Sequence, residues 1–70
     1  SNTAIRIKEL AKQRGISMRQ VLIAAGLNYN TMTAMRTSMP KADNLARIAD
    51  ILDCSVDFLL GRTDNPEINK

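Results

Sequence analysis

Residues 26–36 read GLNYNTMTAMR, and this stretch decides how the middle of the chain folds. Gly26 suits the left-handed position that follows the end of one helix, and Asn28 suits the position that caps the next. The connection Gly26-Leu27-Asn28 is too short for two helices to lie side by side, so they must cross at a steep angle. The stretch therefore predicts a helix-turn-helix, with Leu27 buried inside the turn.

The segments around this turn have helical spacing of apolar residues and recognisable helix ends. Ser17 and Gln20 form a capping box that begins a helix at about residues 18–25, and the helix after the turn covers about residues 29–36. Further helices are expected over about residues 3–14, 42–53 and 56–60. The sequence therefore predicts a compact all-α domain of five short helices.

Apolar residues at helical spacing supply a stripe to each helix and predict one core. These residues are Ile7, Leu10, Ala11, Val21, Leu22, Ala25, Met32, Met35, Leu45, Ile48, Ala49, Leu52, Cys54, Phe58 and Leu59. Ile5, Ile23 and Ile51 fall outside the stripes, and Leu60 lies at a helix end. These four residues are either scattered exposed side chains or parts of a dimer or partner surface.

The composition excludes several kinds of site. The chain has 70 residues, one cysteine and no histidine, so it holds no internal disulfide and no Cys/His zinc site. The commonest general base is absent as well, and we expect no catalytic site, no metal site and no cofactor. Because no apolar run is long enough for a membrane span and the start lacks a signal-peptide pattern, we expect a reducing, cytoplasmic setting.

The charges are unevenly distributed along the chain. Residues 1–42 hold seven Lys or Arg and one Glu, whereas residues 43–70 hold three Lys or Arg and six Asp or Glu. This asymmetry indicates either a basic surface that meets polyanions or an unevenly charged surface without a partner. Tyr29, Asn30, Thr33 and Ala34 point outward on the short helix after the turn, and such a projecting helix fits a DNA major groove.

Several segments resemble the phage-repressor and Cro type of helix-turn-helix domain, also called the xenobiotic-response-element family. They read RIKELAKQRGIS (6–17), AAGLNYNTM (24–32) and NLARIADILDCSVDFLLGRT (44–63), and the resemblance covers residues 5–62. It implies a lambda-repressor-like DNA-binding domain over residues 1–62, followed at 63–70 by a polar tail or the start of a linker. It further implies a bacterial or phage transcriptional repressor that binds a near-palindromic double-stranded DNA operator as a homodimer.

The resemblance, together with the residue types, also assigns candidate DNA contacts. Candidate base contacts are Met18, Tyr29, Asn30, Thr33 and Ala34. Candidate phosphate contacts are Ser17, Arg19, Thr31, Arg36, Thr37, Ser38 and Lys41. Met18 stands where the family often has glutamine, so the usual amide contact is absent. Lys41 stands where a capping serine is common, which predicts a poorer start for the helix at 42–53.

Each of these side chains also has a plain structural interpretation. The Asn30 amide either reads adenine N6 and N7 or serves a local turn. Tyr29 either contacts phosphate or a thymine methyl, or it covers the preceding helix, and Thr33 is either a methyl contact or a solvated residue. Arg36 either contacts DNA or interacts with the helix dipole. Lys41 and Arg19 are either phosphate contacts or free surface charges, and for Arg14 we expect a free charge.

Two functions from different classes remain open at this stage. The first is a DNA-binding repressor domain with helix 29–36 in the major groove. The second is a protein-interaction module of the same fold, an antitoxin or adaptor that binds a partner through apolar faces. The basic half of the chain favours the first, and the isoleucines outside the stripes favour the second or a dimer. No small-molecule ligand is evident for either.

Overall fold

The computed structural model describes residues 2–28, 30–35 and 37–68, and for residue 32 the backbone alone. The described residues form helices and no strand, which confirms the all-α prediction. The helices are α1 (Asn2–Gln13), α2 (Met18–Ala24), α3 (Asn30–Ala34), α4 (Ala42–Leu52) and α5 (Val56–Leu60). The helix expected over 29–36 is thus observed over Asn30–Ala34, while residues 29 and 36 lie outside the described part.

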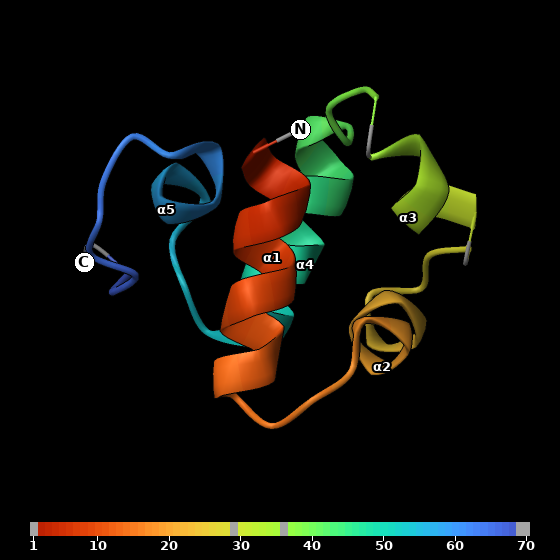
Figure 1. Ribbon diagram of the computed structural model, residues 1–70, viewed down its shortest axis with the longest axis horizontal. Coiled ribbons are helices and arrows are strands. Elements are labelled where there is room, and N and C mark those ends of the chain that lie inside the picture. Colours follow the sequence, from red (N-terminus) through yellow and green to blue (C-terminus); the bar gives the residue numbers. More distant parts are fainter. Residues whose placement is uncertain (1, 29, 36, 69–70) are drawn as a thin grey trace.

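The helices are arranged around a central pair. Helices α1 and α4 pack together in the middle, and α5 packs against both on one side (Figure 1). Helix α2 packs against α1 and α4 on the other side, and α3 packs against α2. As a result α3 and α5 lie at opposite ends of the longest axis, which is 31 Å long.

The buried side chains form one cluster that draws on all five helices or their immediate flanks. The predicted core residues that the structure describes are buried, with two exceptions. Leu27 and Phe58 are only partly buried and pack against the edge of the cluster, so the full burial expected of Leu27 is wrong. A domain this small has a large surface relative to its volume, and a residue within a turn keeps one side in water.

The predicted helix ends are confirmed in atomic detail. The Ser17 hydroxyl accepts from the backbone N–H of Gln20, and the Gln20 side chain accepts from the backbone N–H of Ser17, at 3.1 and 2.9 Å. Ser55 caps α5 in the same way by accepting from the backbone N–H of Phe58. Gly26 has a φ of +72°, a left-handed conformation that other residues adopt at a cost of about 1–2 kcal/mol. These local signals set where α2 begins and ends, and where α5 begins.

Two hydrogen bonds join segments that are distant in the sequence. The Arg14 guanidinium Nε–H donates to the Leu52 carbonyl at 3.1 Å and so caps the C-terminal end of α4. The expectation that Arg14 is a free surface charge is therefore wrong, because a cation is stabilised beside the unpaired carbonyls of a helix end. The backbone N–H of Ser55 donates to the Pro66 carbonyl at 2.9 Å, which holds the segment after α5 against the body.

The start of α4 lacks a side-chain cap, as the sequence predicts. Lys41 occupies the N-cap position in an extended conformation and makes no capping hydrogen bond. Replacing Lys41 by serine is expected to raise the free energy of unfolding by about 1 kcal/mol, because a serine hydroxyl accepts from a backbone N–H of the first turn. Thermal unfolding followed by circular dichroism measures this change. A variant Lys41→Ala supplies no cap, so an equal gain with alanine would contradict the capping explanation.

Four apolar side chains outside the core are exposed, as expected. Ile5, Ile23, Ile51 and Leu60 are exposed by 56%, 65%, 37% and 40%, and they lie on α1, α2, α4 and α5 respectively. Their exposure shows that the core does not need them. Whether a second protein molecule covers any of them stays a prediction.

Candidate nucleic-acid interface

Helix α3 has one face in the core and one face in water. Met35, directly after the helix, is 1% exposed and anchors the buried side, and Thr31 is half-buried beside it. Asn30, Thr33 and Ala34 are exposed. Positions three and four residues apart share a face of a helix, so these three side chains form one continuous outward surface. We call this surface, residues 30, 33 and 34, the outer face of α3.

Asn28 caps the beginning of α3. The Asn28 side-chain oxygen accepts from the backbone N–H of Asn30 at 2.9 Å, and the Asn28 carbonyl accepts from the N–H of Thr31 at 2.9 Å. The capping role predicted for Asn28 is confirmed by these bonds. These bonds involve the Asn28 side chain and the Asn30 backbone. They do not involve the Asn30 side chain, which is exposed.

The end of α3 is closed by two hydroxyl side chains. Ser38 Oγ donates to the Ala34 carbonyl at 3.0 Å, and Thr37 Oγ1 approaches the same oxygen at 3.4 Å. The backbone N–H groups of both residues also donate to it, at 3.2 Å from Thr37 and 2.9 Å from Ser38. Serine and threonine are suited to this bond back to a carbonyl three or four residues earlier. While the two hydroxyls are bonded in this way, they cannot donate to a phosphate.

The polar groups of the outer face of α3 form no hydrogen bond with the described part of the chain. The structure contains no hydrogen bond from the carboxamide of Asn30 or from the hydroxyl of Thr33 to any described residue. An exposed amide offers both a donor and an acceptor in one plane. The outer face of α3 therefore presents the donor and acceptor of the Asn30 carboxamide and, about one turn later, the hydroxyl and methyl groups of Thr33.

Helix α2 packs against α3, and the start of α2 carries three further candidates. Arg19 is exposed in the first turn, and Ser17 is exposed but already caps the helix. Met18 is half-buried and packs against the core, so only part of its side chain remains for any other contact. Lys41, at the start of α4, is exposed. Tyr29 and Arg36 lie outside the described residues, as does the side chain of Met32.

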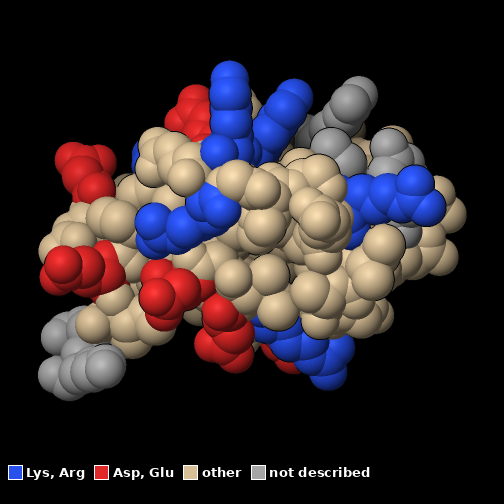
Figure 2. Space-filling model, turned by 90° about the horizontal axis from the view of Figure 1, so that it is seen from below, with Lys and Arg blue, Asp and Glu red and all other residues tan. Residues whose placement is uncertain are grey.

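The charges of the folded domain are segregated along its length. Figure 2 shows one long face, on which Asp and Glu gather toward the end that holds α5 and the C-terminal segment. Lys and Arg lie over the middle and toward the opposite end, which holds α2 and α3. The imbalance seen along the sequence is therefore also an imbalance in space. A polyanion is attracted to the end with α2 and α3 and repelled from the other.

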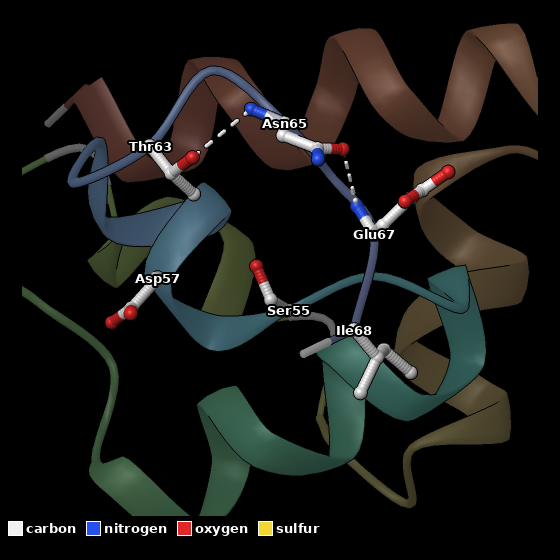
Figure 3. A pocket seen from close by; sticks show the side chains of 6 residues that line it. All are labelled: Ser55, Asp57, Thr63, Asn65, Glu67 and Ile68. Carbon is white, nitrogen blue, oxygen red and sulfur yellow. Dashed lines mark hydrogen bonds between the residues drawn. The ribbon is translucent and has the colours of Figure 1, made fainter. Parts of the chain in front are cut away.

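A shallow hollow lies at the acidic end of the domain. It has a volume of about 320 Å³ and is lined by Ser55, Asp57, Thr63, Asn65, Glu67 and Ile68 (Figure 3). Its polar groups are used in local turns: Thr63 Oγ1 accepts from the N–H of Asn65, and the Asn65 side-chain oxygen accepts from the N–H of Glu67. These bonds shape the C-terminal segment.

Three further features concern the cysteine thiol, metal ligands and membrane-spanning helices. Burial raises the pKa of the Cys54 thiol; Arg14 opposes this shift and Asp53 adds to it, so the thiol behaves as a small apolar core group. Within residues 2–28, 30–35 and 37–68 no three His, Cys, Asp or Glu side chains gather as metal ligands would. In the same residues no helix combines the length and apolar character needed to cross a bilayer.

Comparison with known proteins yields one family. The model of the Cro/C1-type HTH DNA-binding domain matches residues 6–65, which include α2, α3 and most of the remaining fold. No curated protein and no solved structure matches the chain. The match confirms the family resemblance inferred from the sequence.

Proposed function

Because the chain belongs to the Cro/C1-type HTH DNA-binding domain family, we propose that it binds a specific double-stranded DNA sequence with α3 in the major groove. In this proposal it has the lambda-repressor-like form of the fold and acts as a transcriptional repressor in the cytoplasm. Two copies bind a near-palindromic operator, with their α3 helices about 34 Å apart.

The observation that carries the proposal is the outer face of α3. A short helix anchored in the core by Met35 presents an amide, a hydroxyl and methyl groups to water, and neither polar group makes a hydrogen bond to a described residue. Amide groups and methyl groups are the chemistry that reads base edges in the major groove. The arrangement therefore suits direct contact with bases.

Two exposed basic residues at the starts of α2 and α4 support phosphate binding. Arg19 lies in the first turn of α2, and Lys41 occupies the N-cap of α4. The N-terminal end of a helix carries a partial positive charge, so a cation there reduces stability by a few tenths to about 1 kcal/mol. A contact with a phosphate of the bound DNA would explain why a basic residue stands at each of these two positions despite its cost to stability.

The other proposed contacts follow from position. Ser17 retains a hydroxyl hydrogen that is able to donate to phosphate, because its oxygen acts as the acceptor in the capping box. Thr37 and Ser38 must exchange their bonds to the Ala34 carbonyl before donating to phosphate. Tyr29, Met18 and Arg36 stay proposed contacts by family position, as does Thr31.

A second candidate function is a protein-interaction module, an antitoxin or adaptor. The observation that favours it is Ile23, which is 65% exposed on α2. Such a side chain contributes apolar contact area to a protein partner at little loss to the fold. The charge segregation and the polar outer face of α3 are better explained by DNA.

The test is a selection of duplex DNA from a random pool, first at low salt and then at rising salt. Specific recognition predicts an enriched sequence with two-fold symmetry and an affinity that falls steeply with salt. Sedimentation of the selected duplex with the protein then measures whether two protomers bind each site. Absence of binding even at low salt would overturn the proposal and direct attention to Ile23 and a protein partner.

A further inference from the structure

The chemical composition of the outer face of α3 limits the bases that it is able to read. We infer, resting on the proposed DNA-binding function, that the base pairs facing residues 30–34 are A·T pairs. Asn30 faces an adenine, and Thr33 with Ala34 faces a thymine one or two base steps away. Three lines of argument support this: the groups that are present, the groups that are absent, and their spacing along the helix.

The groups present match adenine and thymine. A carboxamide donates to adenine N7 and accepts from adenine N6 at the same time, and the methyl groups of Thr33 and Ala34 pack against the C5-methyl of thymine. The Asn30 side chain is exposed and makes no hydrogen bond to a described residue, so binding breaks no hydrogen bond within the described part of the chain.

The groups absent from α3 are those that read guanine and cytosine. The helix Asn30–Ala34 has the sequence NTMTA, which contains no Arg or Lys to bind guanine O6 and N7, and no Asp or Glu to accept from cytosine N4. The Thr33 hydroxyl hydrogen-bonds either class of base pair and does not discriminate. Guanine contacts, where they occur, must come from a residue outside this helix, such as Arg19.

The spacing of the groups sets how far apart the two bases lie. Positions 30 and 33 are separated by about 4.5 Å along the helix axis and positions 30 and 34 by about 6 Å. Successive bases on one strand are about 3.4 Å apart. Asn30 and the methyl groups of residues 33 and 34 therefore reach bases on neighbouring or next-neighbouring steps, which defines a short A·T element within each half-site.

The experiment uses the duplex enriched in the selection above and alters single atoms of its bases. Each adenine of a half-site is replaced in turn by 7-deazaadenine, which lacks the N7 acceptor, and each thymine by deoxyuridine, which lacks the methyl group. Affinities are measured for the unmodified protein and for Asn30→Ala and Thr33→Ser. Thr33→Ser keeps the hydroxyl and removes the methyl, and Asn65→Ala, in the C-terminal segment far from α3, is the matched control.

We expect one 7-deazaadenine position to weaken binding by the unmodified protein roughly ten-fold and binding by Asn30→Ala less than about two-fold. One deoxyuridine position is expected to weaken binding by the unmodified protein about three- to four-fold, and to weaken binding by Thr33→Ser less, because only the Ala34 methyl group then remains against the thymine methyl. Asn65→Ala should respond to both bases as the unmodified protein does. Circular dichroism confirms that each variant is folded.

Three results would overturn the inference, and they differ in whether the proposed function survives. An enriched half-site whose Asn30-dependent positions are G·C pairs keeps the proposed function and removes the A·T assignment. Equal effects of each base analogue on the unmodified protein and its variants do the same. A failure to enrich any sequence removes the proposed function and this inference with it.

Discussion

Replacing Ile48 by alanine is expected to remove a large fraction of the domain's free energy of unfolding. Ile48 lies on α4, is 0% exposed and belongs to the single core cluster. Truncation of a buried isoleucine to alanine lowers the free energy of unfolding by about 2–5 kcal/mol. A domain of 70 residues has about 4–10 kcal/mol in total, so the loss is a large fraction of it.

The measurement is thermal and urea unfolding followed by circular dichroism. A loss of this size lowers Tm by at least about 10 °C in a domain of this length. Ile5→Ala on α1 is the matched control, because Ile5 is 56% exposed and its truncation is expected to lower stability by less than about 1 kcal/mol. Similar losses for the two variants would show that Ile5 is buried in solution, for example by a second protomer.

Replacing Arg19 by glutamate is expected to change stability and DNA binding in opposite directions. An acidic residue in the first turn of α2 interacts favourably with the helix dipole, so the free energy of unfolding should rise by about 0.3–1 kcal/mol. The same change replaces a proposed phosphate contact by a repulsion, so affinity for the selected duplex should fall roughly 100-fold at low salt. The slope of log affinity against log salt should become shallower by about one.

Arg62→Glu separates this local effect from the change in net charge. Arg62 follows α5 at the far end of the domain, is exposed and forms a weak surface pair with Asp57 at 3.8 Å. The two variants change the charge by the same amount, but Arg62→Glu is expected to weaken binding less than about three-fold. Equal losses would mean that net charge alone governs binding and that Arg19 touches no phosphate.

The helices could be predicted from the sequence because their ends depend on neighbours in the chain. Ser17 with Gln20, Ser55 and Gly26 each act within four residues, and each performs its expected role. The closing of α3 by Thr37 and Ser38 is equally local. A hydroxyl three and four residues after the last helical residue was a usable signal for it.

Contacts between distant residues could not be predicted in the same way. Arg14 and Leu52 are 38 positions apart, and only the packing of α1 on α4 brings the guanidinium to the carbonyl. The bond between Ser55 and Pro66 likewise depends on how the C-terminal segment folds back. An arginine after a helix and a proline in a polar stretch have many possible environments, and the sequence does not distinguish among them.

Some features of the candidate site were likewise predictable from local sequence, and others depend on packing or on DNA. Helical periodicity predicted that positions 30, 33 and 34 share an exposed face, and the structure places them there. The partial burial of Met18 depends on how α2 settles on the core, which periodicity alone does not determine. Which atoms of DNA each side chain contacts depends on a molecule outside the chain, so those assignments rest on chemistry and await the selection experiment.

The burial of Cys54 has a practical consequence for site-directed spectroscopy. It is the single cysteine of the chain, it is 2% exposed and its pKa is raised, so little reactive thiolate is present at neutral pH. A cysteine introduced at Thr33 therefore becomes the one accessible thiol and accepts a maleimide dye or spin label selectively. No background mutation is needed, and the label reports directly on the immediate environment of α3 when duplex DNA is added.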